Sequence, residues 1–335
     1  MNLSSTCLYV ISVVLVVLFM GCASFTPIQL ESGQRMAQRM AVGFETPIHE
    51  PFFLSGGSNA VLFVHGYPGS PAQMRPMAEA LHAKGWTVQG LLIPGSGKDM
   101  GRLASLNGHE WTNAIRSAVV ELAQNYERVL VVAYSMGAAM TCASLKPGDI
   151  DGLVLIAPYQ WKESASKYFV WTILRPFMPD YYQPFRKIDL TDPEIRARLT
   201  RYFPHGYLDQ PEYQEEVRSC ILPIALIANL RSIVRSSFGP KWVGSNIPIL
   251  VLQGSEDTVA EPLRSRELAT RWAGRTRYEE FVGDHLAIET TSPALPSVIT
   301  RLCFFVTERA AVKPIRSRIT HKTDFEKLLV EKPEW

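Results

Sequence analysis

The chain has 335 residues, of which 47% are hydrophobic, and its formal net charge is +2. This length and this apolar fraction permit one large domain with a substantial core. The charge is too small to indicate a nucleic-acid partner, and no basic stripe interleaved with aromatic residues is present. The five cysteines lack metal-ligand spacing, and phosphate-loop and dinucleotide motifs are missing, so we expect no metal and no cofactor.

The N-terminal segment differs from the rest of the sequence. Residues 8–20 are almost uninterruptedly apolar and lead into Gly21-Cys22-Ala23-Ser24. The apolar run is short for a membrane span and suits the core of a signal peptide. Glycine directly before Cys22 is typical of bacterial lipoprotein signals, although Phe19 and Met20 depart from the usual pattern.

These features predict a membrane-associated protein of the bacterial cell envelope. We interpret residues 1–21 as a signal peptide or membrane anchor and Cys22 as a lipidation site. An uncleaved anchor and simple secretion are the alternatives. Ser24, two positions after Cys22, favours a lipoprotein of the outer membrane or one that faces the periplasm.

The next segment, residues 22–57, contains three prolines that interrupt regular structure, so we expect a tether and lead-in there. A buried strand is predicted at 59–64, and it runs into His65-Gly66-Tyr67-Pro68-Gly69-Ser70. A glycine-rich loop at a strand end lets backbone N–H groups turn toward a ligand, as an oxyanion hole requires. The pattern then alternates through a helix at 71–84, a strand at 86–93 and a helix at 109–126.

A second buried strand is predicted at 129–134, and it stops at Ser135 before residues 138–140, which indicate the start of a helix. A serine at such a turn exposes its Oγ, and the helix N-terminus beneath it favours developing negative charge. Ala133 and Gly137 are small, which lets strand and helix approach closely. The pattern Ala-x-Ser-x-Gly is therefore typical of a nucleophile elbow, and the simpler interpretation is a serine that only caps a helix.

The alternation of predicted strands and helices stops after a strand at 150–157 and resumes only at residue 247. The segment between them is too long for a plain loop and must have structure of its own. It is rich in tyrosine, phenylalanine and tryptophan, most of which we expect to pack within the insert and against the sheet. An aromatic insert over a serine nucleophile also suits an apolar acyl group.

Two further motifs lie later in the chain, the first of them directly after an apolar strand. A strand at 247–252 leads into Gly254-Ser255-Glu256-Asp257, and residues 277–281 precede Gly283-Asp284-His285. The candidate residues thus occur in the order serine, aspartate, histidine, each beyond a predicted strand. This order is the one expected of hydrolases that carry a nucleophile elbow.

With the loop at 65–70 and the turn at 134–137, these motifs resemble those of the α/β-hydrolase superfamily, most nearly its bacterial carboxylesterase and monoacylglycerol-lipase branch. The resemblance extends over residues 59–309, although Ala133 replaces the glycine that is usual in that branch. It implies an α/β fold with a mostly parallel, doubly wound sheet and a helical cap insertion. The expected parts are a core at 58–157 and 246–309, a cap at 158–245 and a C-terminal tail at 310–335.

Each candidate residue has a chemical role in this arrangement. Ser135 would be the nucleophile, and His285 would be the base that takes and returns its proton. Asp257 would bind the other ring nitrogen of His285 and fix the tautomer. Asp284 adjoins His285, but its side chain would have to fold back onto its neighbour, so Asp257 is favoured.

The remaining candidates are backbone groups. The N–H groups of Tyr67 and Met136 would form the oxyanion hole. The resemblance implies that His65 braces this loop by hydrogen bonds and takes no part in the chemistry.

The sequence therefore predicts a serine hydrolase that cleaves carboxylic esters such as monoacylglycerols, lysophospholipids or other short esters through an acyl-enzyme on Ser135. The expected partners are a small ester with an apolar acyl group and a membrane reached through the N-terminal lipid or anchor. A serine peptidase or an acyltransferase on the same fold is an alternative, as is a surface lipoprotein without catalysis. A serine at this position argues against dehalogenase and epoxide hydrolase chemistry, which need an acidic residue.

Overall fold

A computed structural model describes residues 41, 43–161, 165–178, 180–183, 185–200, 207–220 and 222–310. The predicted signal segment, Cys22 and the tail from residue 311 onward lie outside these residues. Those described fall into two compact units. One holds Phe44–Gln160 together with the residues from Leu230 onward, and the other holds Trp161–Asn229.

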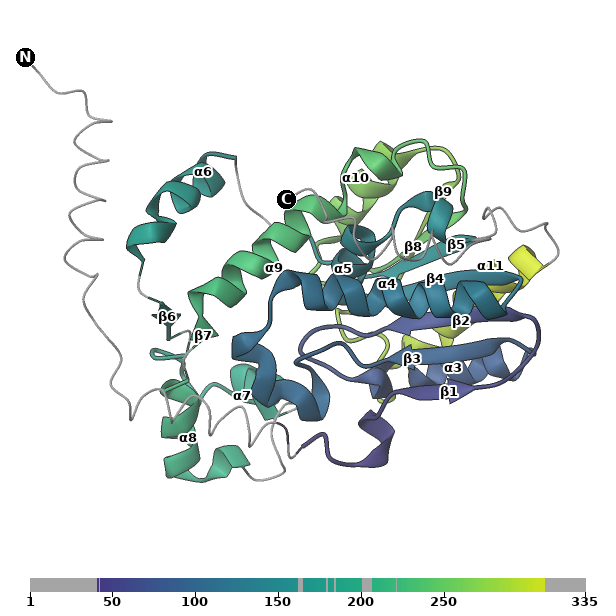
Figure 1. The fold of residues 1–335 in the computed structure, drawn as a ribbon. Helices are drawn as coiled ribbons and strands as arrows, with labels where there is room; N and C mark the ends of the chain where they lie inside the picture. The colour runs from purple at the N-terminus through teal and green to yellow at the C-terminus, as the bar shows by residue number, and fades with distance from the viewer. Residues whose placement is uncertain are drawn as a thin grey trace, which may run out of the picture. The chain divides into compact units, whose positions relative to one another are not determined.

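The larger unit is built on a seven-stranded sheet with the order β1-β3-β2-β4-β5-β8-β9 (Figure 1). Only β1 runs antiparallel to its neighbour; the remaining pairs are parallel. This confirms the predicted α/β fold with a mostly parallel sheet. The strands are β1 (Phe52–Leu54), β2 (Asn59–Val64), β3 (Thr87–Leu91), β4 (Arg128–Tyr134), β5 (Gly152–Ile156), β8 (Ile249–Gly254) and β9 (Thr276–Phe281).

The central strands form because their sequences are continuous apolar runs. Every residue of β4, β5 and β8 is buried, and β2 is buried from Ala60 onward. Strands of this kind lie in the middle of parallel sheets that are covered on both faces. Gln253, the one polar side chain in β8, is an exception and is fully buried.

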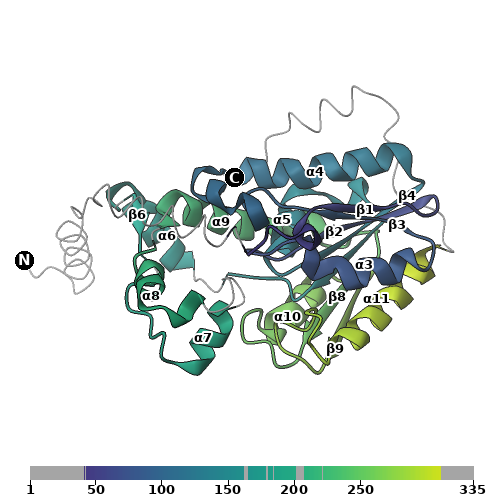
Figure 2. The same ribbon diagram turned by 90° about the horizontal axis from the view of Figure 1, so that it is seen from below.

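Helices cover both faces of this sheet. Figure 2 shows α4 on one face and α3 with α11 on the other. Helix α4 begins after Asn107, whose side chain accepts hydrogen bonds from the amides of His109 and Glu110 and thereby caps the helix. The helices of this unit are α3 (Arg75–His82), α4 (Gly108–Asn125), α5 (Met136–Ser144), α10 (Pro262–Trp272) and α11 (Leu295–Ala310).

Strand β1 lies in the segment that the sequence analysis assigned to the tether. It pairs Phe52 with Gly90 and Leu54 with Val88 at the sheet edge. A three-residue edge strand directly after Pro51 carries too little apolar periodicity to be predicted. The predicted helix at 71–84 is the 3-10 helix η2 (Pro71–Met74) followed by α3, whereas the 3-10 helices η1 (Pro47–His49) and η3 (Gly97–Ser105) were not expected.

The smaller unit has structure of its own. It contains α6 (Ala165–Leu174), α7 (Pro193–Thr200), α8 (Pro211–Arg218) and a two-stranded ribbon of β6 (Tyr181–Tyr182) and β7 (Leu222–Pro223). Its small core is formed by Leu190, Leu208, Val217 and Cys220. Helix α9 (Ile224–Ser237) begins in this unit and ends in the larger one.

Within the described parts of the chain, no helix combines the length and the hydropathy that crossing a membrane requires.

Candidate active site

The three residues predicted to form the site follow the carboxyl ends of three parallel strands. Ser135 connects β4 to α5, Asp257 follows β8, and His285 follows β9. Because β8 and β9 are neighbours and only β5 separates them from β4, these ends meet at one edge of the sheet. This edge is where α/β sheets place their ligand sites.

Ser135 occupies a strained backbone conformation, with φ 52° and ψ −121°. A non-glycine residue with positive φ is uncommon, and such strain persists only where surrounding contacts impose it. Hydrogen bonds to segments distant in the sequence do so here, in addition to the bond from the Ala138 amide to the Ser135 carbonyl at 3.1 Å. The Ser135 amide donates to the Ile156 carbonyl at 2.9 Å, and the Tyr159 amide donates to the Ser135 carbonyl at 3.2 Å.

Gly137 lets the first turn of α5 pack against the end of β2. A Cβ at this position would lie 2.1 Å from the His65 carbonyl oxygen and 2.9 Å from that of Val64. Both neighbours are backbone atoms, so they cannot move aside cheaply. Glycine is therefore required at position 137, two residues after the serine, by its contact with the backbone at the end of β2 and the start of the loop that follows it.

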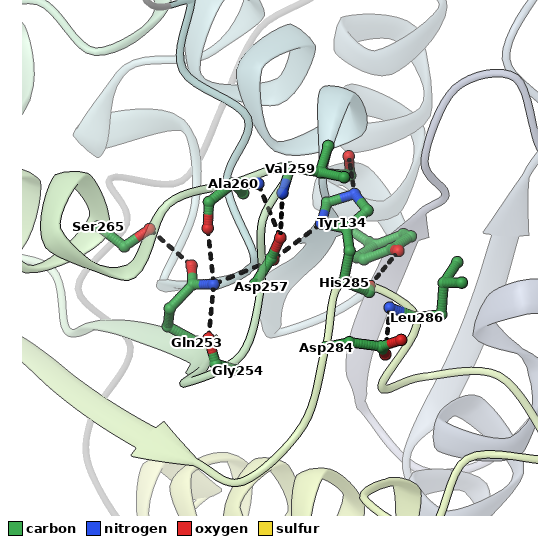
Figure 3. Close-up of polar contacts among 11 residues, drawn as sticks. Tyr134, Gln253, Gly254, Asp257, Val259, Ala260, Ser265, Asp284, His285 and Leu286 are labelled. Carbon is green, nitrogen blue, oxygen red and sulfur yellow. Dashed lines mark hydrogen bonds and ion pairs between the residues drawn. The ribbon is translucent and has the colours of Figure 1, made fainter. Parts of the chain in front are cut away.

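A chain of hydrogen bonds joins the three predicted residues. Ser135 Oγ lies 2.9 Å from His285 Nε2. His285 Nδ1 lies 2.8 Å from Asp257 Oδ2 (Figure 3). Since a carboxylate only accepts hydrogen bonds, Nδ1 carries the proton and Nε2 is left as an acceptor facing the serine hydroxyl. The arrangement can therefore move a proton from Ser135 Oγ to His285.

The Asp257 carboxylate is fully buried and accepts four hydrogen bonds. Its Oδ1 accepts from the amides of Val259 and Ala260, each at 2.8 Å. Its Oδ2 accepts from Gln253 Nε2 at 3.0 Å as well as from His285. A buried carboxylate is tolerated only where donors such as these satisfy its oxygens.

Asp284, the alternative acid, is exposed and its Oδ1 accepts a hydrogen bond from the Leu286 amide at 2.9 Å. This bond turns its side chain along its own loop, and Asp257 occupies the position beside His285 Nδ1.

The loop that carries His285 is attached to its surroundings at several points. The Tyr134 hydroxyl donates to the His285 carbonyl at 2.6 Å, and the two rings lie 5.3 Å apart at 33°. The Glu256 amide donates to the Gly283 carbonyl at 3.0 Å, which ties the aspartate loop to the histidine loop. A Cβ at Gly254 would lie 2.3 Å from that same carbonyl oxygen, so only glycine permits this approach.

The loop after β2 is organised by His65, which is fully buried. His65 Nε2 accepts a hydrogen bond from the Ile93 amide at 3.1 Å, so Nδ1 carries the proton and donates to the Gly66 carbonyl at 2.7 Å. Burial lowers the pKa of His65 to about 4, so the ring is neutral near pH 7. The Gly66 carbonyl and the Tyr67 N–H belong to one peptide unit, so His65 also fixes the direction of that N–H.

The two predicted oxyanion donors lie in the loop after β2 and at the start of α5. Neither the Tyr67 amide nor the Met136 amide donates a hydrogen bond to any residue that the structure describes. Met136 is the first residue of α5, whose N-terminus carries partial positive charge. The Tyr67 hydroxyl is buried without a partner among the described residues, and burial raises the pKa of Tyr67 above its ordinary value.

A comparison with protein-family models identifies the family of this chain. The model of the alpha/beta hydrolase family matches residues 61–295. The chain belongs to this family. The match covers the loop after β2, the serine turn and both later motifs, as the sequence resemblance implied.

Individual relatives of this α/β hydrolase match only part of the chain, at moderate sequence identity. A thermostable monoacylglycerol lipase of Bacillus sp. (strain H-257) is 35% identical over 109 residues, which are 32% of this chain and 43% of that protein. The match thus spans less than half of that lipase. A carboxylesterase of Bacillus subtilis (strain 168) is 28% identical over 199 residues, or 58% of this chain and 73% of that protein.

The fold is also found among solved structures. One structure, from a study of the metagenome-derived lipolytic enzymes LipS and LipT, is similar to this chain with a TM-score of 0.57 and 21% sequence identity. The match covers 78% of this chain and 98% of that one. At this identity the likeness supports the shared fold alone.

Two residues of the site were not singled out in the sequence. Tyr134 was only the variable position before the serine, and its hydroxyl bond to the His285 loop joins segments far apart in the chain. Gln253 carried a weak signal, since it is the one polar side chain in the apolar strand β8.

In the described part of the chain, no group of three or more His, Cys, Asp or Glu side chains could hold a metal ion.

Proposed function

We propose that this α/β hydrolase is a serine hydrolase that cleaves carboxylic esters through an acyl-enzyme on Ser135. The observation that carries the proposal is the continuous hydrogen-bonded chain from Ser135 Oγ through His285 to the buried Asp257 carboxylate. A serine hydroxyl is a poor nucleophile by itself, and a base at hydrogen-bond distance with the correct tautomer removes this weakness.

In the first half of the reaction, Ser135 Oγ attacks the ester carbonyl carbon while its proton passes to His285 Nε2. The carbonyl oxygen becomes an oxyanion, which the N–H groups of Tyr67 and Met136 would bind. The tetrahedral intermediate then collapses, the bond from carbon to the alcohol oxygen breaks, and His285 returns the proton to the leaving alcohol. The product is an acyl ester on Ser135.

In the second half, water attacks the acyl carbon and gives its proton to His285 Nε2. The bond from the acyl carbon to Ser135 Oγ breaks, the proton returns to the serine, and the carboxylic acid leaves. Asp257 remains ionised throughout and stabilises the imidazolium that forms in each half.

The substrate class is proposed from two sources. The curated relatives are named as a monoacylglycerol lipase and a carboxylesterase, which favours esters of small alcohols. The segment 158–245 is rich in aromatic residues, which favours an apolar acyl group if this segment forms the predicted cap. We therefore propose monoacylglycerols, lysophospholipids or other short and medium acyl esters as substrates.

The N-terminal sequence extends the proposal to location. The apolar run at 8–20 followed by Gly21 and Cys22 supports a lipoprotein of the bacterial cell envelope, anchored to a membrane through Cys22. Labelling of the native host with radioactive palmitate should mark the protein, and Cys22→Ala should abolish the label. Unlabelled wild-type protein would contradict the anchor.

The activity is tested with a panel of p-nitrophenyl and glycerol esters of increasing acyl length. We expect the wild-type protein to hydrolyse short to medium esters and Ser135→Ala to lose turnover. The matched control is Ser105→Ala, because Ser105 is exposed and, among the described residues, its hydroxyl bonds only to the Arg102 carbonyl. Unchanged turnover in Ser135→Ala would overturn the proposal, while transfer to added alcohol or cleavage of amides in place of esters would indicate the acyltransferase or peptidase.

A further inference from the structure

A buried glutamine contacts the carboxylate of the site from the side opposite His285. Gln253 lies in β8 and is fully buried. Its Nε2 donates to Asp257 Oδ2 at 3.0 Å, to the Ala260 carbonyl at 2.9 Å and to the Gly254 carbonyl at 3.2 Å. Burying a side-chain amide away from water is costly unless its nitrogen and its oxygen are both hydrogen-bonded, so a buried glutamine in this strand indicates a specific role.

The surroundings determine which end of the amide faces Asp257. Among the residues that the structure describes, the hydrogen-bond partners on that side are oxygens that only accept, namely a carboxylate and two carbonyls. The nitrogen end must therefore point there, since an oxygen in its place would face three acceptors. At the other end Oε1 accepts a hydrogen bond from the Ser265 hydroxyl at 2.7 Å.

Ser265 completes the arrangement. It is fully buried on α10 and is the partner of Gln253 Oε1 (Figure 3). Without this hydroxyl the amide oxygen would be buried without a donor. Ser265 thus holds Gln253 in the orientation that presents a donor to Asp257.

We propose that Gln253, oriented by Ser265, is a positioning residue that acts on the reaction through Asp257. Asp257 Oδ1 is held by two backbone amides, and Gln253 Nε2 is the donor besides His285 that holds Oδ2. Together these contacts fix the plane of the carboxylate and aim Oδ2 at His285 Nδ1. The proposal rests on the proposed serine hydrolase function and adds to it the group that keeps its acid in place.

A purely structural role is the competing explanation, because Gln253 also bonds to two backbone carbonyls of the loop that carries Asp257. A double-mutant cycle separates the two. If Gln253 acts through Asp257, removing its amide should lower kcat only while the Asp257 carboxylate is present. If Gln253 merely stabilises the fold, its replacement should lower kcat by the same factor with and without that carboxylate.

The experiment compares Gln253→Met, which keeps the length of the side chain and removes the amide, with Asp257→Ala and with the double variant. We expect Gln253→Met to lower kcat about tenfold with KM nearly unchanged, as loss of a hydrogen bond to a charged group implies. In the Asp257→Ala background the same change should alter kcat less than about twofold.

The control variant is Thr87→Val, which removes two partly buried hydrogen bonds at the start of β3, to the Gly57 carbonyl and from the Gly56 amide. It should lower thermal stability and leave kcat unchanged. A second readout does not depend on turnover. The low-field proton resonance of His285 Nδ1–H should shift in Gln253→Met and remain in place in Thr87→Val.

The outcomes are distinct. Wild-type kcat in Gln253→Met, or an equal loss with and without the Asp257 carboxylate, overturns the inference and leaves the proposed function intact. A wild-type protein without esterase activity overturns the proposed function and this inference with it. If Gln253→Met fails to fold, Ser265→Ala decides the matter: a two- to threefold lower kcat, as a rough expectation from one lost neutral hydrogen bond, supports the inference, and an unchanged kcat overturns it.

Discussion

Replacement of Asp257 by asparagine should reverse the histidine tautomer, and the structure shows why. The backbone amides of Val259 and Ala260 both donate to Oδ1 at 2.8 Å, so the asparagine oxygen must occupy that position. Its NH₂ group then takes the place of Oδ2, which lies 2.8 Å from His285 Nδ1. Nδ1 would have to accept, and the ring proton would move to Nε2.

The consequence falls on the serine. With a proton on Nε2, His285 donates to Ser135 Oγ across 2.9 Å and cannot take the hydroxyl proton. Loss of the correct tautomer in a serine triad costs roughly 10⁴-fold in kcat, equivalent to about 5 kcal/mol of transition-state stabilisation. The side chains are nearly isosteric, and Gln253 Nε2, which loses its acceptor at Oδ2, keeps the Gly254 and Ala260 carbonyls, so the fold should be kept.

The assay is steady-state hydrolysis of a p-nitrophenyl ester by the wild-type protein, Asp257→Asn and Asp284→Asn, with circular dichroism as a check on folding. Asp284→Asn is the matched control, because the Asp284 side chain is exposed and, in the part of the chain that the structure describes, bonds only within its own loop. We expect near-wild-type turnover in this control. A folded Asp257→Asn protein that keeps more than about a tenth of wild-type kcat would refute the reasoning.

Three further predictions concern the elements that support the site. Gly137→Ala should destabilise the protein by about 1–3 kcal/mol in urea unfolding and lower activity, because its Cβ would lie 2.1 Å from the His65 carbonyl oxygen; wild-type stability would contradict the packing described. Tyr134→Phe should lower kcat a few-fold with little change in KM, since it removes the 2.6 Å bond to the His285 carbonyl and about 1 kcal/mol of stabilisation; unchanged kinetics would show that this bond does not hold the loop. Burial lowers the pKa of His65 from 6.5 to about 4, so between these values the unfolded chain binds a proton that the folded chain excludes. The free energy of unfolding should therefore fall by about 3 kcal/mol as the pH drops from 6.5 to 4, and in His65→Asn this part of the pH dependence should disappear from denaturant titrations.

The sequence was sufficient to predict the sheet and the three residues that the hydrogen-bonded chain joins. Strands β2, β4, β5 and β8 are continuous apolar runs, and each motif follows directly on a strand end. Parallel strands bring their carboxyl ends to one edge, so residues distant in sequence could be placed together without knowledge of side-chain positions.

What the sequence could not supply were contacts set by side-chain orientation. Gln253 is a single polar residue in an apolar strand, and its proposed role as a positioning residue follows only from the three acceptors around its nitrogen. Tyr134 gave no signal, because its partner is a backbone carbonyl, which has no sequence signature. Strand β1 was missed since it depends on pairing with β3 and has little pattern of its own.

The central claim is that Ser135 is the nucleophile of an acyl-enzyme. The most direct measurement is to treat the folded protein with a fluorophosphonate and locate the adduct by peptide mass spectrometry. A single adduct on Ser135 is the expected result, with none in Ser135→Ala and much slower labelling in Asp257→Asn. Folded wild-type protein that stays unlabelled, or that carries the adduct on another residue, would contradict the claim.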